Sequence, residues 1–254
     1  MKQLHYKSYG EGPPLVILHG LFGMSDNWRT FANELADQFQ VILPDLRNHG
    51  RSFQEEEINY PLMAEDVKSL MDHEGWDRVH LMGHSMGGKV AMEFAHSFPE
   101  RVDHLIIVDI APKTYPSGHD EIFEALRSLP IDQIQSRSEA QEHLAQHIPQ
   151  KGIQLFLMKN LKRHASGGYE WKMNLDSLYR HYSDILAGIQ IDPPYFGPCL
   201  FIGGAKSRYI QDGDHELIFD AFKNARIEMI PNAGHWVHAE QPEALLELVR
   251  GFLS

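Results

Sequence analysis

The chain has 254 residues, enough for one α/β domain with a substantial core and an insertion. Its hydrophobic fraction of 43% and charged fraction of 23% are typical of a globular protein. Lys and Arg number 23 against 35 Asp and Glu, which gives a formal net charge of -12. Nucleic acids and anionic membranes attract clustered basic residues, so this charge argues against both kinds of partner.

The single cysteine, Cys199, excludes an intramolecular disulfide. It lies in an apolar run, and free cysteine is commonly buried, so we expect a core residue rather than a nucleophile. Residues 1–6 contain no apolar signal segment, and the apolar run at 15–18 is far shorter than the roughly 20 residues that span a bilayer. We therefore expect a cytoplasmic protein.

Short apolar runs alternate with segments of helical periodicity along the chain. The apolar runs predict strands at 15–18, 41–43, 79–82, 105–108, 199–202 and 227–230. The periodic segments predict helices at 27–37, 62–73, 86–97, 214–222 and 242–253. Repeated strand, helix, strand units are typical of a mostly parallel sheet with helices on both faces, so we predict an α/β fold.

The pattern changes between Pro112 and Pro193, where the strand-like runs vanish. Segments 121–129, 138–148 and 153–161 have the spacing of short amphipathic helices. We therefore predict an α/β core formed by residues 1–112 and 195–254. Residues 113–194 are predicted to be a helical cap inserted over the site.

The pentapeptide Gly83-His84-Ser85-Met86-Gly87 lies where a predicted strand becomes a predicted helix. A serine between two glycines at such a junction is typical of the nucleophile of a serine hydrolase. The sharp turn exposes the hydroxyl, and a side chain at either glycine would collide with neighbouring backbone. An ordinary Gly-Ser turn is the alternative interpretation, which the flanking strand and helix disfavour.

A serine hydroxyl needs a positioned base, and that base needs an orienting acid. His235 is the best candidate for the base, because it lies late in the chain in a glycine-bearing loop directly after the last predicted strand. His238, three residues further on, is the alternative. The order serine, acid, histidine is the one expected for this architecture.

The acid is less clearly marked. Many proteins of this architecture place it after the strand at 199–202, but here no carboxylate follows that strand before Asp212 and Asp214. Asp109 instead ends the apolar run 105–108, one strand along from the serine. Pairing with a buried imidazolium is a physical reason for a carboxylate in so apolar a setting. We therefore predict Asp109, with Asp212 and Asp214 as alternatives.

Acyl transfer forms an oxyanion that pre-oriented backbone N–H groups must stabilise. Met86, directly after the serine, supplies one N–H at the start of its helix. The second is expected from the loop after strand 15–18, where Gly20 lets the backbone turn inward. Leu21 is the expected donor and Phe22 the alternative, while His19 is interpreted as a structural residue that holds this loop.

With these residues in place, the chain resembles the α/β-hydrolase superfamily over essentially its full length. Within it, the chain is similar to the YbfF-like esterases, which are related to the ABHD-eleven type hydrolases. The stretches that carry the resemblance are His19-Gly-Leu-Phe-Gly-Met-Ser-Asp-Asn, Asp45-Leu-Arg-Asn-His-Gly-Arg-Ser, Gly83-His-Ser-Met-Gly-Gly-Lys, Val108-Asp-Ile-Ala-Pro, His119-Asp-Glu-Ile-Phe and Ala233-Gly-His-Trp-Val-His-Ala-Glu. The resemblance implies Asp109 as the acid, and hydrolysis of short-chain esters or acyl-CoA thioesters without a cofactor.

Bulky residues near or inside the predicted cap suit an apolar pocket for acyl chains. Phe22, Trp171 and Trp236 are the candidates for substrate binding, although most aromatic residues at helical spacing are ordinary core. His143 and His147 lie four residues apart, but no third ligand stands nearby, so we expect no metal site.

Lys89, one turn into the nucleophile helix, is interpreted as half of a structural ion pair or as a solvated amine. Contact with an acyl-CoA phosphate is the alternative. The sequence predicts a serine esterase acting on a small ester or thioester. Acyl-CoA thioesterase, acyltransferase and non-catalytic small-molecule binder are the alternative functions, and the sequence does not indicate an oligomeric state.

Overall fold

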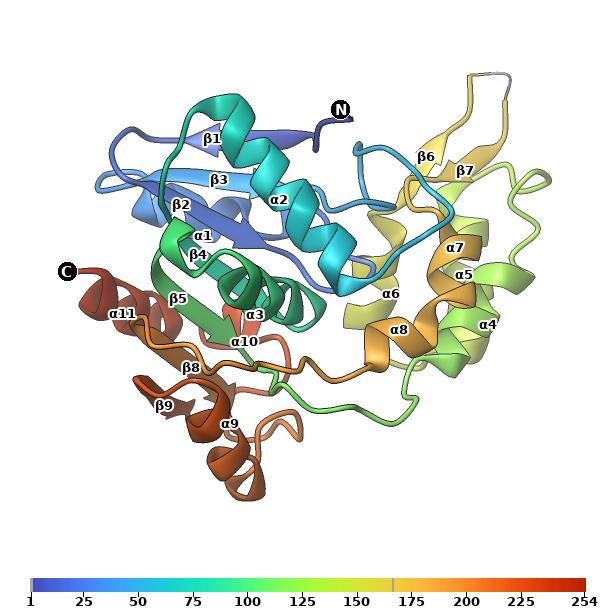
Figure 1. Cartoon of the computed structure of the whole chain (residues 1–254). Helices are drawn as coiled ribbons and strands as arrows, with labels where there is room; N and C mark the ends of the chain where they lie inside the picture. The colour runs from blue at the N-terminus through green and yellow to red at the C-terminus, as the bar shows by residue number, and fades with distance from the viewer. Residues whose placement is uncertain (1, 166) are drawn as a thin grey trace.

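The computed structural model describes residues 2–165 and 167–254. A seven-stranded sheet with the order β1-β3-β2-β4-β5-β8-β9 forms its centre (Figure 1). Its strands are β1 (Tyr6–Tyr9), β2 (Pro14–Leu18), β3 (Gln40–Pro44), β4 (Val79–His84), β5 (Val102–Val108), β8 (Cys199–Gly204) and β9 (Ala225–Ile230). Neighbouring strands run parallel except β1, which pairs antiparallel with β3. The predicted mostly parallel sheet is confirmed.

Consecutive residues of the inner strands pack on opposite faces of the sheet. In β2, Val16 and Leu18 belong to the hydrophobic core on one face, and Leu15 and Ile17 belong to the core on the other. Burial on both faces explains why these strands are continuous apolar runs in the sequence. Cys199 is buried in β8 as predicted, and burial raises the pKa of its thiol well above the ordinary value.

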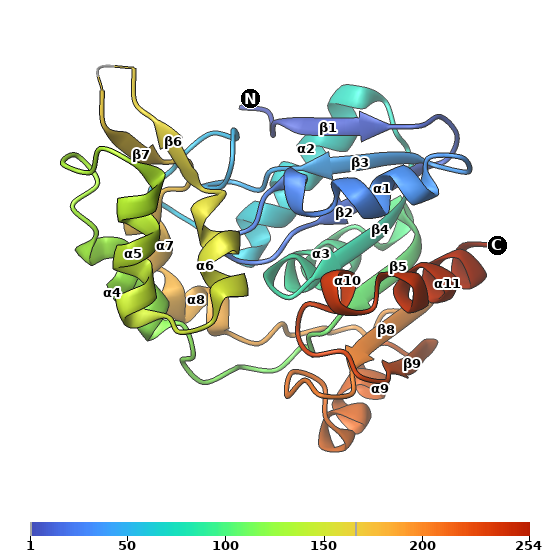
Figure 2. The ribbon, with the colours of Figure 1, turned by 180° about the vertical axis from the view of Figure 1, so that it is seen from behind.

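Helices cover both faces of the sheet, as Figures 1 and 2 show from opposite sides. On the first face lie α2 (Tyr60–Glu74), α3 (Met86–Ser97) and α9 (His215–Ala221). On the second face lie α1 (Arg29–Leu35) and α11 (Pro242–Leu253). The remaining short helices outside the 113–194 region are η1 (Ser25–Asn27), η2 (Pro99–Arg101), η3 (Asp212–Asp214) and α10 (Val237–Glu240). In the described part of the chain, no helix is long and apolar enough to cross a bilayer.

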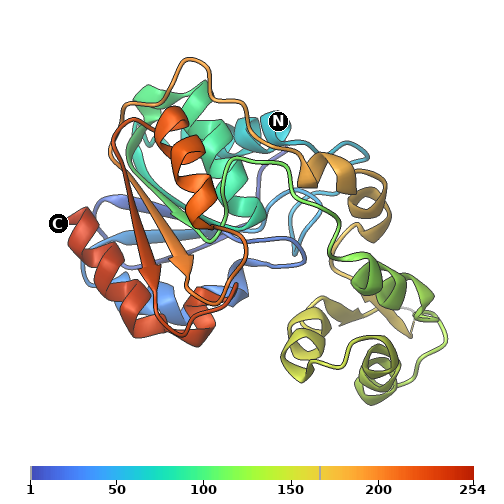
Figure 3. The ribbon, with the colours of Figure 1, turned by 90° about the horizontal axis from the view of Figure 1, so that it is seen from below.

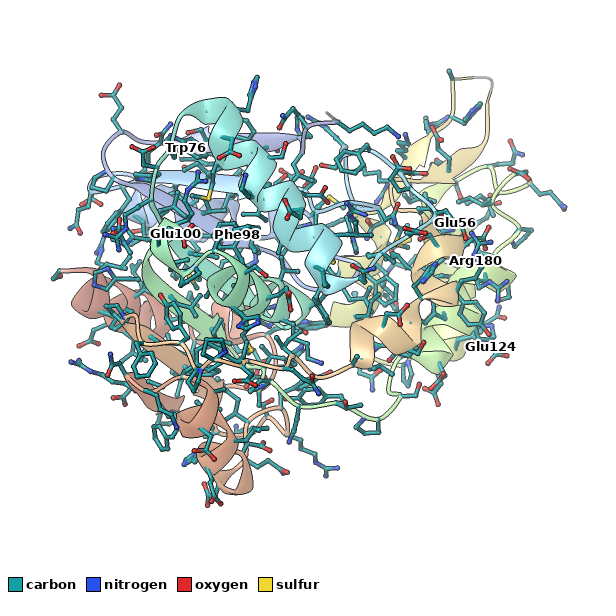
Figure 4. The ribbon with its side chains drawn as sticks, in the orientation of Figure 1. Glu56, Trp76, Phe98, Glu100, Glu124 and Arg180 are labelled. Atoms are coloured by element: carbon teal, nitrogen blue, oxygen red, sulfur yellow. The ribbon has the colours of Figure 1, made fainter. Side chains whose placement is uncertain are left out.

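Residues 113–194 form a group of short elements beside the sheet (Figure 3). Its helices are α4 (Asp120–Ser128), α5 (Arg137–His147), α6 (Lys151–Met158), α7 (Leu175–Arg180) and α8 (Tyr182–Leu186). Figure 4 labels Glu56 and Arg180, whose side chains form an exposed ion pair between the loop after β3 and α7. The division of the chain into a core and an inserted cap stays a prediction.

A hairpin in this group corrects the sequence analysis. Strands β6 (Leu161–Arg163) and β7 (Tyr169–Trp171) pair antiparallel in a region predicted to contain no strands. Each strand has only three residues, and β6 is largely exposed, so neither produces an apolar run. The third predicted cap helix is present but ends earlier than predicted. Helix α6 ends at Met158 rather than at residue 161, because Leu161 already belongs to β6.

Both ends of helix α2 carry residues that typically begin or end a helix. The side chain of Asn59, the N-cap residue, accepts a hydrogen bond from the N–H of Leu62 at 2.9 Å. Pro61 lies in the first turn, where its missing N–H costs no helical hydrogen bond. Gly75 ends the helix with a φ of 74°, in the left-handed region that favours glycine.

We expect Asn59→Ala to lower the free energy of unfolding by about 1 kcal/mol, because the Leu62 N–H loses its acceptor. Urea unfolding followed by circular dichroism measures the change. Asn59→Asp keeps an acceptor oxygen at the same position and should stay near the wild type. Equal losses in the two variants would contradict the capping role.

Candidate functional site

Three side chains from different strand ends meet at one edge of the sheet. Ser85 follows β4, Asp109 follows the neighbouring β5, and His235 lies in the loop after β9. Parallel strands end at the same edge, which explains the convergence of residues far apart in sequence. The Nε2 atom of His235 lies 3.1 Å from Oγ of Ser85, and its Nδ1 lies 2.7 Å from Oδ2 of Asp109.

Ser85 occupies a sharp turn between β4 and α3. Its φ is 54°, in the left-handed region, and its N–H donates to the carbonyl of Val108 at 3.0 Å. A Cβ on Gly83 would overlap the carbonyl of Gly87, and a Cβ on Gly87 would overlap the carbonyl of Leu18. The close approach of three backbone segments therefore requires both glycines.

Asp109 is completely buried, and its carboxylate is fully engaged by donors. Its Oδ1 accepts from the N–H of Gly204 at 2.9 Å, and its Oδ2 accepts from the hydroxyl of Ser207 and from Nδ1 of His235. These bonds offset the cost of removing a carboxylate from water. The φ of Asp109 is 51°, unusual for a residue with a side chain and found where surrounding structure enforces it.

The loop after β8 supplies a donor to the site rather than the acid. The hydroxyl of Ser207 in this loop donates to Asp109. Asp214 instead pairs with Nζ of Lys113 at 2.6 Å, and Asp212 is exposed. A polar residue shortly after a strand end was the one available signal for Ser207, and it is a weak one.

Aromatic side chains surround the imidazole of His235. The ring of Tyr209 stacks on it, with centroids 3.8 Å apart and planes inclined by 17°. Nε2 of His84 donates to the His235 carbonyl at 2.8 Å. His238 stacks on Trp28, with ring centroids 4.3 Å apart. Packing thus directs His235 toward the serine and His238 toward the core.

Burial also controls the charge of the neighbouring histidines. It lowers the pKa of His84 well below the usual value and the pKa values of His119 and His238 to about 4, with the nearby His235 as a further, smaller cause. These three rings are therefore neutral near pH 7. A proton on His235 would face the Asp109 carboxylate without repulsion from a second imidazolium.

The backbone near Ser85 presents two N–H groups. In the described part of the chain, the N–H groups of Leu21 and Met86 have no hydrogen-bond acceptor, and both residues border the same cavity as Ser85. The N–H of Phe22 instead donates to Nε2 of His49 at 3.3 Å. Burial lowers the pKa of His49 to about 3, which leaves that nitrogen free to accept.

His19 and His143 also lie within hydrogen-bond distance of neighbouring groups. Nδ1 of His19 donates to the Gly20 carbonyl, and its Nε2 accepts from the N–H of Leu46, so it holds the loop after β2 as expected. His143 lies 3.0 Å from the hydroxyl of Ser128. Across residues 2–165 and 167–254, no group of three or more histidine, cysteine or acidic side chains is arranged to hold a metal ion.

A cavity of about 340 Å³ lies between Ser85 and the 113–194 region. Its lining includes Tyr115, His119, Tyr182 and Tyr209. The three predicted substrate-binding residues, Phe22, Trp171 and Trp236, are not among the residues that line it. Their part in substrate binding stays a prediction.

Each of those three residues packs elsewhere. The ring of Phe22 lies against Phe123, with centroids 5.1 Å apart, and is nearly fully buried. Trp171, on β7, borders a separate surface cavity. Trp236 packs against Phe156, with ring centroids 5.5 Å apart. The sequence placed bulky residues near the site but did not distinguish the cavity walls from the packing behind them.

Comparisons with known proteins agree with this architecture. The family model described as "alpha/beta hydrolase fold" matches residues 13–242. The chain is 37% identical over 242 residues to "Esterase YbfF" of Escherichia coli, covering 95% of this chain and 93% of that protein. It is 37% identical over 250 residues to "sn-1-specific diacylglycerol lipase ABHD11" of Mus musculus, covering 95% and 81%. A solved structure titled "Marine microorganism esterase" matches with a TM-score of 0.97 and 41% identity, covering 99% of this chain and all of that one.

The turn at Ser85 gives a prediction about stability. Gly87→Ala should lower the free energy of unfolding by about 1–3 kcal/mol, because the added methyl overlaps the Leu18 and His19 carbonyls, which cannot move without shifting the sheet. Gly251→Ala is the matched control, since a Cβ there meets nothing within 4 Å and alanine favours helix. Denaturant unfolding compares the two; a Gly87 variant as stable as the Gly251 variant would contradict the packing described.

Proposed function

Because the chain belongs to the α/β-hydrolase family and is an ester hydrolase, we propose that it hydrolyses short-chain carboxylic esters with Ser85 as nucleophile, His235 as base and Asp109 as orienting acid. The observation that carries this proposal is the pair of hydrogen bonds from His235, one to the serine hydroxyl and one to the buried carboxylate. That arrangement is what a serine needs to act as a nucleophile near neutral pH.

Catalysis would proceed in two steps through an acyl-enzyme. Nε2 of His235 accepts the hydroxyl proton as Oγ of Ser85 attacks the ester carbonyl carbon. The tetrahedral intermediate then collapses, and the alcohol leaves with the proton from His235. In the second step His235 removes a proton from water, which attacks the acyl carbon and releases the acid and Ser85.

Backbone and carboxylate stabilise the charges that develop along this path. The N–H groups of Leu21 and Met86 would receive the oxyanion, and losing one such donor typically costs about 3–4 kcal/mol in the transition state. Asp109 would hold His235 with its proton on Nδ1 and stabilise the imidazolium. The neutral state of His84 and His238 supports this, because neither opposes that positive charge.

The size of the cavity favours a small substrate. At about 340 Å³ it lies at the low end of ligand pockets, which supports short acyl chains over long ones. An acyl-CoA thioesterase or an acyltransferase would use the same acyl-enzyme with a different leaving group or acceptor. A non-catalytic binder is disfavoured, because all three groups of the hydrogen-bonded series are present. Cofactor-free chemistry and a cytoplasmic location stay predictions of the sequence.

Ser85→Ala should reduce turnover of p-nitrophenyl acetate and butyrate by as much as about a millionfold, because the acyl-enzyme cannot form. Release of p-nitrophenol measured at 405 nm follows the reaction. Ser97→Ala, at the other end of α3 on the exposed surface, is the control and should keep wild-type turnover. Equal release by Ser85→Ala and the wild type would reject the proposed function.

Asp109→Asn should reduce turnover by about ten-thousandfold, because an amide favours the wrong histidine tautomer while keeping the shape of the side chain. Asp212→Asn and Asp214→Asn are controls of identical chemistry outside the contacts of His235 and should stay near the wild type. The same colorimetric assay separates them. A loss confined to the Asp214 variant would assign the acid there instead.

A further inference from the structure

Lys89 is a buried amine without a counter-ion. Its side chain is 1% exposed, and in the described part of the chain it forms no ion pair. Its Nζ donates to the carbonyls of Leu186 and Ala187 at the end of α8, and the ring of Tyr115 lies 4.9 Å from it. The interpretation of Lys89 as a structural ion pair or a solvated amine is therefore wrong.

Lys89 is one of the residues that line the Ser85 cavity. Arg208, an exposed side chain with no ion-pair or hydrogen-bond partner among the described residues, contributes to the same wall. No aspartate or glutamate is among the described residues that line the cavity, although the chain as a whole carries a net charge of -12. The cavity is thus a cationic site in an acidic protein.

The other titratable groups of the lining do not offset these charges. Burial raises the pKa values of Tyr60, Tyr115, Tyr182 and Tyr209 and lowers that of His119 to about 4, so all five are neutral near pH 7. Beyond Tyr115, Lys113 and Asp214 neutralise each other as an ion pair. The formal charge that faces the cavity therefore comes from Lys89 and Arg208.

Buried charges in proteins are normally paired, because an unpaired charge loses its hydration without compensation. Lys89 has two carbonyl acceptors for three N–H groups, and neither acceptor is ionised. Burial accordingly lowers the pKa of Lys89 to about 7. An anion entering the cavity would supply the missing partner and favour the charged ammonium.

The position of Lys89 relative to Ser85 sets the scale of such an anion. Ser85 directly precedes α3, Lys89 lies in the first turns of that helix, and both residues line the same cavity of about 340 Å³. An ester carbonyl at Ser85 and a carboxylate at Lys89 can therefore belong to one small molecule. A carboxylate is acceptor-only and forms strong charge-assisted bonds with both lysine and arginine.

We propose that the preferred substrates are small esters that carry a second, ionised carboxylate, which Lys89 and Arg208 bind inside the cavity beside Ser85. This inference rests on the proposed function and specifies its substrate class. Lys89 holds the anion at the inner wall through its remaining N–H, and Arg208 neutralises it at the exposed side. The carbonyls of Leu186 and Ala187 fix the position of the ammonium.

The test compares charged esters with neutral ones of the same shape. Monoethyl succinate against ethyl succinamate places the carboxylate on the acyl side, and 4-acetoxybutyrate against 4-acetoxybutanamide places it on the alcohol side. Acid release in a pH-stat at low ionic strength gives kcat/KM for each. We expect the charged member of at least one pair to be favoured by about tenfold, as for a charge-assisted hydrogen bond. A neutral preference in both pairs would overturn the proposal.

Substitutions at Lys89 and Arg208 test whether these residues cause the preference for charged esters. Lys89→Met should reduce the charged-to-neutral ratio by about tenfold, and Arg208→Gln should reduce it severalfold. Lys206→Gln removes another exposed cation, two residues from Arg208, that does not line the cavity, and should leave the ratio unchanged. A variant that merely damages the fold lowers both rates together. An unchanged ratio in Lys89→Met would therefore contradict the assignment, and Arg208→Gln tests it at an exposed position where folding is not at risk.

The pH dependence of the ratio in the wild type gives an independent reading. The ratio should fall as pH rises from 6 to 9, because Lys89 loses its proton with a pKa of about 7 while the carboxylate of the substrate stays ionised. A group that acts equally on both substrates cancels in the ratio. A flat ratio would contradict the part assigned to Lys89. Hydrolysis of the neutral esters that depends on Ser85 tests the proposed function separately, so the two failures are distinguishable.

Discussion

The carboxylate of Asp109 has no exposed surface, and the geometry of the site depends on how this buried charge is stabilised. Gly204 and Ser207 supply donors from the end of β8 and the loop after it, and His235 supplies a third donor from the loop after β9. Because a buried carboxylate needs these donors, both loops are held against the end of β5. The imidazole is thereby oriented with its second nitrogen toward Ser85.

Burial has different consequences for the imidazoles, the carboxylate and the lysine of this region. His84 and His238 are neutral, because burial removes the hydration that a charged imidazolium would need. Asp109 is compensated inside the folded chain itself. The ammonium of Lys89 has only two carbonyls as partners inside the folded chain. In the proposed complex its charged partner is the carboxylate of the bound substrate.

Most of the strands that the sequence predicts are buried on both faces of the sheet. The segment 15–18 was predicted as a strand because every residue of β2 beyond Pro14 is buried, which produces an unbroken apolar run. The edge strand β1 is half-exposed and mixes polar with aromatic residues, so it gave no such run. The hairpin of β6 and β7 was missed for the same reason and because its strands are short.

The sequence by itself determined the turn at Ser85 and pointed to Asp109, because the contact between Gly83 and the Gly87 carbonyl and the end of a buried strand are local properties. Only the tertiary structure decided that Ser207 donates to the acid and that Tyr209 stacks on His235. It also decided which bulky residues line the cavity. Those contacts join segments that are distant along the chain, and their geometry follows from packing between layers, which no local pattern of residues encodes.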